Sequence, residues 1–298
     1  MAGGSSGAID PGDPGDPGGP ADAVVASARA GEPDRYLAAL LAPTPARAGL
    51  LALAALSGEL ARVPLAVTRE PAMGDIRLQW WRDALADGAP ATRTGHPVAD
   101  AVRDAIARHA LPRALIDGLI DVREFDLSGA PMPDDATLAS YLWKSEGAAF
   151  ALAARVTGVA PGAGLQAVAT AAGEAYGLVR LLLGLPQALS RGRLQLPQTR
   201  IAAAGATAHD LLSGTGGEAT AALLAGLRAD ARTQLRAARQ HVADLPRTQR
   251  TAFLPLALVE PYLRTLERPG RHPLREAVEL VPFARVVRIA AAHWLGRI

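Results

Sequence analysis

Residues 74–83 read GDIRLQWWRD, a stretch that places two adjacent tryptophans, Trp80 and Trp81, among charged side chains. Neighbouring residues on a helix point about 100° apart, so one tryptophan can enter a core while the other lies at its margin. The charged neighbours are Asp75, Arg77, Arg82 and Asp83. Because charged groups beside buried rings are costly, this stretch predicts a place where something packs or binds.

The sequence on both sides of this stretch has a helical pattern. From Tyr36 onward alanine and leucine dominate, apolar residues recur at spacings of three and four, and no sustained period-two alternation appears. Proline and glycine breaks delimit the predicted helices: 35–42, 46–62, 74–87, 97–109, 113–126, 136–158, 163–185, 207–213, 217–244, 250–267 and 273–296. No change of composition divides residues 34–298, so we predict one all-α domain there.

Residues 1–33 differ in composition from the rest of the chain. They are rich in glycine, proline and aspartate and repeat Asp-Pro-Gly. Such a segment buries too little apolar surface to offset its ordering entropy, so we expect a disordered tail over 1–33. It lacks the basic start of a secretory signal and has no arginine before Arg29. We therefore expect a cytoplasmic protein, with peripheral contact at the inner face of the membrane left open.

Composition excludes several kinds of chemistry. The absence of cysteine rules out disulfides, thiolate zinc sites, iron–sulfur clusters and cysteine nucleophiles. The six histidines are scattered, and neither a phosphate-binding glycine loop nor a G-x-S-x-G motif occurs. The net charge of +2 gives little support for a nucleic-acid partner. Apolar runs such as residues 50–56 are short, so no transmembrane segment is expected.

Two segments late in the chain are amphipathic. One carries a stripe of four arginines, Arg228, Arg232, Arg236 and Arg239, and the other is VVRIAAAHWLGRI at residues 286–298. For the first we expect a solvated face, and for the second we expect packing against the core. Contact with anionic lipid or an acidic partner is the alternative for the arginine stripe.

Four further segments extend the pattern of residues 74–83 along the chain. They are IDVREFDL (120–127), YLWKSEGAAFALAARVTG (141–158), AAGEAYGLVRLLLGLPQALSRGRLQLP (171–197) and FLPLALVEPYLRTLER (253–268). In this order the segments resemble the squalene/phytoene synthase superfamily, the head-to-head isoprenyl diphosphate synthases, from about Arg35 to the C-terminus. Residues 191–197 are similar to its G-R-x-Y-L-P segment, with Gln195 where tyrosine is usual. The resemblance implies an isoprenoid-synthase fold, an all-α helical bundle around a large central cavity.

Enzymes of that family use Mg²⁺ to ionise a diphosphate leaving group. The metal is held by a D-x-x-x-D motif on each of two facing helices, a spacing that puts both aspartates on one face. The resemblance places the second motif at Gly184 and Ala188, neither of which is a carboxylate. The first motif falls within 52–64, where Glu59 is the only acid. Both positions depart from the catalytic pattern, so no cofactor is expected.

The D-x-x-x-D spacing occurs elsewhere in the chain. The three pairs are Asp83 with Asp87, Asp100 with Asp104, and Asp117 with Asp121. We expect these to be solvated acidic helix faces. The alternative is a relocated Mg²⁺ site in a working prenyl transferase, a phytoene or squalene synthase of isoprenoid biosynthesis.

Three short segments resemble a non-catalytic branch of the superfamily, which includes a mitochondrial assembly factor for respiratory complex I. They are E-L-A at 59–61, R-x-Q-x-W at 77–81 and R-E-x-D-L at 123–127. This resemblance implies a pseudoenzyme that binds an isoprenoid or other lipid-like molecule, or a respiratory-complex client protein, without turnover.

The predicted binding residues combine guanidinium groups with aromatic rings. They are Glu59, Arg62, Arg77, Trp80, Trp81, Tyr141, Glu174, Arg180, Arg191 and Arg193. The arginines can grip a phosphate or carboxylate without metal, and a tryptophan can line the apolar part of the pocket. Two alternatives stay open: internal ion pairs of the arginines with Glu59, Asp75 and Glu174, and a plain helical scaffold.

Overall fold

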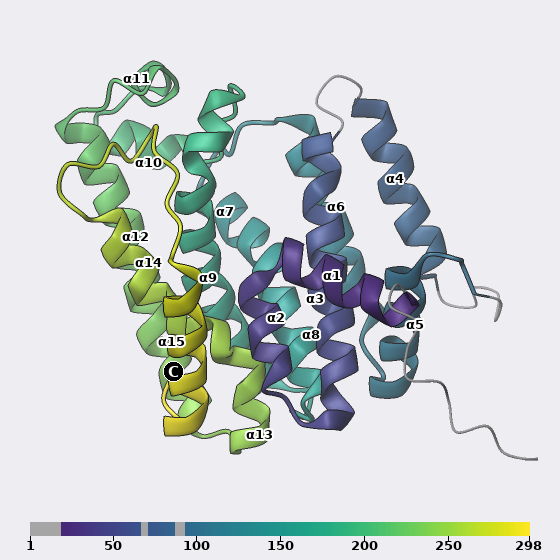
Figure 1. The fold of residues 1–298 in the computed structure, drawn as a ribbon. Coiled ribbons are helices and arrows are strands. Elements are labelled where there is room, and N and C mark those ends of the chain that lie inside the picture. The colour runs from purple at the N-terminus through teal and green to yellow at the C-terminus, as the bar shows by residue number, and fades with distance from the viewer. Residues whose placement is uncertain (1–18, 67–70, 87–92) are drawn as a thin grey trace, which may run out of the picture.

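The computed structural model describes residues 19–66, 71–86 and 93–298, and every regular element in these ranges is a helix (Figure 1). The helices are α1 Pro20–Gly31, α2 Pro33–Leu40, α3 Thr44–Ala66, α4 Pro71–Ala84, α5 Pro97–His109, α6 Arg113–Ser128, α7 Asp135–Leu142, the π-helix η1 Trp143–Gly147, α8 Ala148–Val156, α9 Ala163–Ser190, α10 Gln198–Ala203, α11 Ala208–Ser213, α12 Glu218–Ala243, α13 Arg247–Arg250, the 3₁₀-helix η2 Thr251–Leu258, α14 Val259–Leu266 and α15 Pro282–Leu295. The predicted all-α class is confirmed.

Two long helices, α3 and α9, form the centre of the bundle. Helix α3 packs against α1, α2 and α5, while α9 packs against α12 and the π-helix (Figure 1). By length and composition alone, both are long and apolar enough to cross a membrane. However, 72% and 67% of their most apolar windows are buried inside the protein, as in core helices.

Prolines end fewer helices than the sequence suggests. Pro64 lies inside α3 and Pro186 lies inside α9, so the predicted ends at 62 and 185 are too early. A proline inside a helix removes one backbone hydrogen bond. Burial of Pro64 in α3, and of Leu185 and Leu189 in α9, offsets this loss and carries each helix onward.

The last predicted helix, 273–296, is too long. Residues 273–281 are irregular, and α15 begins at Pro282, which occupies the first-turn position that proline tolerates. The helix ends at Gly296, which adopts a left-handed conformation with φ 66°. The short helix α10 was not predicted.

Helix α1 overturns the expected disorder of residues 20–33. Val24 and Ala28 are buried against the bundle, so this segment gains enough apolar contact to fold. A Cβ built on Gly31 would lie 2.6 Å from Cα of Gly58 in α3, which means that only glycines allow this crossing. The close crossing places Glu32, between α1 and α2, next to the core. The rest of the predicted tail, residues 1–18, lies outside the described residues.

Candidate functional site

A buried cluster of ion pairs joins the N-terminal helices to the centre of the bundle. Nη2 of Arg35 donates to Oε2 of Glu146 at 2.6 Å, and Nη1 of Arg180 donates to Oε1 of Glu32 at 2.6 Å. Nε of Arg180 lies 3.3 Å from Oε1 of Glu146. The side chains of Glu32, Arg35 and Glu146 are only 3%, 8% and 11% exposed. Because an isolated buried charge is costly, each is held by an opposite charge.

The cluster extends to the C-terminal helices through Asp34. Its Oδ2 accepts hydrogen bonds from the hydroxyls of Tyr176 at 2.8 Å and Tyr262 at 3.0 Å, and Nε of Arg285 lies 2.9 Å from its Oδ1. The complete set, which we call the inner network, is Glu32, Asp34, Glu146, Arg35, Arg180 and Arg285. Three carboxylates and three guanidiniums balance one another.

Burial and pairing act in opposite directions on these groups. Burial alone would raise the pKa of Glu146, but Arg180 and Arg35 hold it below its ordinary value. Burial would likewise lower the pKa of Arg35, but Glu146 and Glu32 raise it above its ordinary value. The charged forms of both residues are therefore the stable ones at neutral pH.

Small residues allow Glu146 to reach this network. Glu146 lies in the π-helix η1, a type of turn that is frequent at functional sites. A Cβ on Gly173 of α9 would lie 2.6 Å from Cα of Gly147, and one on Gly177 would lie 3.2 Å from Cγ of Glu146. The two helices therefore touch backbone to backbone, which brings Glu146 within reach of Arg180.

A polar cavity of about 160 Å³ lies beside the inner network. It is lined by Arg123, Tyr141, Leu142, Ser145, Glu146, Gly177, Arg180, Leu181, Gly184 and Gln195. A second cavity of about 180 Å³ shares Arg123, Tyr141, Gly184 and Gln195 with it and adds Arg191 and Arg193. The two therefore adjoin, and together we call them the arginine cavity.

Helices α3 and α9 meet across the second part of the arginine cavity. The lining residues from α3 are Ala61, Pro64 and Leu65, and those from α9 are Gly184, Gln187 and Ala188. These are the two helices on which the resemblance places the D-x-x-x-D motifs. On this wall, within the described residues, α3 and α9 present small and apolar groups together with one amide.

The single acid lining the arginine cavity on this side is Asp126 of α6. Its carboxylate accepts from Tyr141 at 3.0 Å and Gln195 at 2.8 Å, and it pairs with Arg123 at 2.8 Å. Magnesium is held by carboxylates and phosphate oxygens, whereas three arginines face this space and repel a cation. The lining residues therefore do not fit Mg²⁺.

The aspartates with D-x-x-x-D spacing are engaged by their own neighbours. Oδ1 of Asp100 accepts from the backbone and hydroxyl of Thr94, and Asp117 pairs with Arg113 at 2.7 Å. Asp121 pairs with Arg82 at 2.9 Å, and Asp87 lies outside the described residues. Over residues 19–66, 71–86 and 93–298, no three His, Asp or Glu side chains gather as a metal site would require.

The tryptophans line a separate groove of about 380 Å³, the tryptophan groove. Its lining residues are Glu59, Arg62, Val63, Ala66, Arg77, Trp80, Trp81 and His96. Trp81 is 4% exposed and Trp80 is 40% exposed, as helix geometry predicts for adjacent residues. Their ring centroids lie 5.0 Å apart. The groove combines aromatic surface with Arg62 and Arg77.

The structure thus divides the predicted binding residues between two places. Glu59, Arg62, Arg77, Trp80 and Trp81 line the tryptophan groove, whereas Tyr141, Arg180, Arg191 and Arg193 line the arginine cavity. The alternative of internal ion pairs with Glu59, Asp75 and Glu174 holds for Arg62, which pairs with Glu59 at 3.0 Å. Arg180 is also paired, but with Glu32 and Glu146, which that alternative does not name.

Glu174 lines neither the arginine cavity nor the tryptophan groove. Six positions along α9 rotate its side chain about 120° away from that of Arg180. Burial and the neighbouring Asp230 of α12 raise its pKa.

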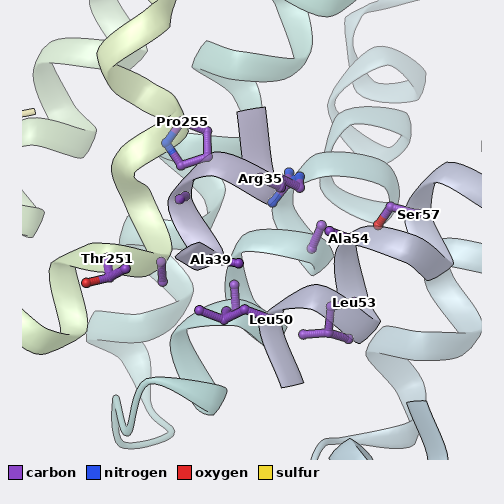
Figure 2. A pocket seen from close by; sticks show the side chains of 12 residues that line it. Arg35, Ala39, Leu50, Leu53, Ala54, Ser57, Thr251 and Pro255 are labelled. Atoms are coloured by element: carbon purple, nitrogen blue, oxygen red, sulfur yellow. The ribbon is translucent and has the colours of Figure 1, made fainter. Parts of the chain in front are cut away.

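On the other side of Arg35 the interior is nearly filled. A cavity of about 20 Å³ lies there, with room for about one water molecule. Figure 2 shows Arg35, Leu50, Leu53, Ser57 and Thr251 around it. The guanidinium of Arg35 lies 4.5 Å from the ring centre of Phe150. Neither this space nor either part of the arginine cavity reaches the roughly 300 Å³ of a typical small-molecule pocket.

Sequence reasoning missed most of the inner network. Glu32 was assigned to the disordered tail, and Glu146 was not singled out within its helix. The signal at Glu146 is a lone acid in the otherwise small and apolar run that continues to Ala154. Such an acid on a buried helix needs a partner, but the sequence does not say which arginine supplies it.

Comparison with solved structures defines the fold as that of an isoprenoid synthase. A dehydrosqualene synthase in complex with ligand superposes with a TM-score of 0.77 at 16% identity, over 93% of this chain and 96% of that chain. The squalene synthase HpnC from Alicyclobacillus acidocaldarius gives a TM-score of 0.72 at 18% identity, over 84% and 94%. At these identities the likeness concerns the fold alone.

The sequence defines the family within that fold. The squalene/phytoene synthase model matches residues 28–287, and the chain belongs to this family. Similar curated proteins are named NADH dehydrogenase (ubiquinone) complex I, assembly factor 6. The Mus musculus protein is 28% identical over 237 residues, which is 79% of this chain and 70% of the relative. The Homo sapiens protein is 26% identical over 78% of this chain and 69% of the relative. The predicted superfamily is confirmed.

Proposed function

We propose that this protein is a non-catalytic member of the squalene/phytoene synthase family that assists the assembly of respiratory complex I. The observation that carries the proposal is the wall where α3 and α9 face each other. The residues that α3 and α9 contribute to it include Ala61, Pro64, Gly184 and Ala188, none of which is a carboxylate. The family resemblance places the second metal motif at Gly184 and Ala188. The similarity to complex I assembly factor 6 supports the assembly role.

The charges around the arginine cavity argue against prenyl transfer. Ionising a prenyl diphosphate calls for Mg²⁺ bridging phosphate oxygens to carboxylates. Here Asp126 is already engaged by Tyr141, Gln195 and Arg123. The proposal accordingly includes no cofactor.

The same arginines suit an anionic ligand. Charge-assisted hydrogen bonds from Arg191 and Arg193 would hold a phosphate or carboxylate group without metal. The tryptophan groove offers aromatic surface and two further arginines to an isoprenoid, another lipid-like molecule or a client protein. We place the protein in the cytoplasm, working at the inner face of the membrane.

Two measurements test the proposal together. Deleting the gene should lower NADH:ubiquinone oxidoreductase activity in membranes, and leave squalene, hopanoid and carotenoid levels unchanged. The purified protein should release no pyrophosphate from farnesyl or geranylgeranyl diphosphate, with or without Mg²⁺. Metal-dependent pyrophosphate release would instead establish a working transferase that uses displaced carboxylates.

Complementation of the deletion tests whether the arginine cavity contributes to assembly, or whether the fold alone is sufficient. The double substitution R191A/R193A should restore complex I activity less well than the wild-type gene. The matched control is R236A/R239A, which removes two arginines from α12 outside either site. Equal complementation by both variants would show that the arginine cavity has no part in assembly.

A further inference from the structure

Helix α15 lies on the near side of the molecule in Figure 1 and packs against η2 and α2. Its residues Ile289 and Ala292 are 1% and 6% exposed. On the same side, Arg285 pairs with Asp34 of the inner network. The inward face is therefore fixed by both apolar packing and an ion pair.

The outward face of α15 is apolar and uncovered. Phe283 and Trp294 are 76% and 75% exposed, and Leu295 is 69% exposed. Val286 and Val287 are 45% and 46% exposed. Phe283, Val287 and Trp294 follow one another at spacings of four and seven, which places them along a single stripe of the helix. Aromatic rings thus stand at both ends of an aliphatic stripe. The expectation that this segment uses its apolar residues to pack against the core is correct only for the inward face.

The charged side chains from Leu280 onward are all arginines. No aspartate or glutamate occurs between Leu280 and Ile298, and Arg288 and Arg297 are exposed. Two more arginines come from α13: Arg247 donates to the carbonyl of Trp294 at 3.4 Å, and Arg250 donates to that of Gly296 at 2.9 Å.

The nearest acids in the sequence lie outside α15 itself. Asp244 lies in the turn before α13, and Glu276 and Glu279 lie in the irregular segment before α15. The side chain of Glu276 already accepts from the backbone of His272 at 3.2 Å. The stripe itself therefore combines apolar and cationic groups.

We propose that the outward face of α15 docks this protein on an anionic lipid surface, with the helix lying flat in the headgroup region. Aromatic and aliphatic residues on one face with arginines at its margin suit that interface. Anionic headgroups complement the arginines. A second copy of the chain is a poorer occupant, because a twofold contact through α15 would bring the arginines of both copies into one interface without an aspartate or glutamate from residues 280–298 to pair with them.

The test uses the full-length protein with lipid vesicles. It should co-sediment with vesicles of phosphatidylcholine and phosphatidylglycerol, bind phosphatidylcholine alone much less, and dissociate as salt rises. The substitution F283S/W294S should weaken binding by about tenfold or more, because two large rings no longer enter the lipid. The matched control is M73S/I76S on α4, whose residues are 41% and 61% exposed, and it should bind like the wild type. The vesicle affinity of R288E should fall between that of F283S/W294S and that of the wild type.

Fluorescence gives an independent readout at the residue itself. Brominated phosphatidylglycerol should quench Trp294 in the wild type, whereas W294F should still bind but lose most of the quenching. The proposal is overturned if the wild type stays in the supernatant, or if F283S/W294S binds like the wild type. It is equally overturned if size-exclusion chromatography shows a dimer that F283S/W294S dissolves. Vesicle binding does not depend on complex I, so failure here leaves the assembly proposal standing.

Discussion

The inner network and the arginine stripe of α12 contain ion pairs of similar length in different surroundings. On the surface, Arg232 donates to Oε1 of Glu267 at 2.7 Å, and Arg228 and Glu260 complete the group. The side chains of Arg232 and Glu267 are 30% and 35% exposed, against 8% and 11% for Arg35 and Glu146. Distance alone therefore does not predict how much each pair stabilises the fold, because water screens the Arg232–Glu267 pair and is nearly excluded from the Arg35–Glu146 pair.

The comparison also refines the prediction for the α12 stripe. Arg228 and Arg232 do not simply face solvent, because Glu260 of α14 and Glu267, which directly follows that helix, are their partners. The spacing within α12 could not reveal acids that lie about thirty residues further along the chain. The following predictions test how far the two groups of ion pairs differ.

Removing one charge of the inner network should have the largest effect. The substitution Glu146→Gln leaves Arg35, which is buried, and Arg180 with one carboxylate fewer. We expect the free energy of unfolding to fall by about 3–5 kcal/mol, measured by urea denaturation. A loss below about 1 kcal/mol would mean that water enters the network as freely as it reaches α12.

Replacing both members of a buried ion pair should lower the free energy of unfolding much less than the sum of the two single replacements. The double substitution Arg35→Met with Glu146→Leu replaces two charges by apolar groups of similar size, and Arg180 still pairs with Glu32. We expect a double-mutant cycle to give a coupling energy on the order of 1–3 kcal/mol. Additive losses would show that the two residues act independently.

Acid should weaken the inner network. In the folded protein, Arg180 and Arg35 hold the pKa of Glu146 below its ordinary value, which is about 4.3 in an unfolded chain. The stability from this group is therefore fully present above about pH 4.3 and is lost as the pH falls through its folded pKa. Denaturation curves between pH 7 and pH 3 should show this loss, and Glu146→Gln should flatten it more than Glu267→Gln does.

On the surface, Glu267→Gln should change little. Arg232 keeps Glu260 as a partner, and solvent compensates for the lost charge. We expect a destabilisation below about 1 kcal/mol that shrinks further as salt is added. If Glu267→Gln destabilised the protein as much as Glu146→Gln does, the difference in exposure would not explain how the surface ion pairs differ from the inner network.

The smallest effect is expected at Glu174, which forms no ion pair with an arginine or lysine among the described residues. Burial and Asp230 raise its pKa, so its charged form opposes folding near neutral pH. Glu174→Gln should raise the melting temperature slightly at pH 7. The difference between the variant and the wild type should vanish at pH 4, where the Glu174 carboxyl is largely protonated and therefore neutral, like the glutamine. A lower melting temperature at pH 7 would contradict this assignment.

The sequence predicted the helices well and their partners poorly. Helix α5 has the predicted bounds, 97–109, and Trp80 and Trp81 divide between margin and core as expected. By contrast, the tryptophans and the cavity arginines were grouped as one site, although the fold separates them into the tryptophan groove and the arginine cavity. Helical spacing predicts which residues share a face within a turn or two of one helix. A site is built from several helices, and the spacing does not predict which helices pack together.

The sequence by itself determined that this chain is helical and which family pattern it follows. Each of these is a property of composition and spacing. Only the tertiary structure decided that Arg35 meets Glu146, 111 positions away, and that the outward face of α15 stays uncovered. The reason is that such contacts follow from backbone crossings such as Gly31 on Gly58, whose partners no local pattern specifies.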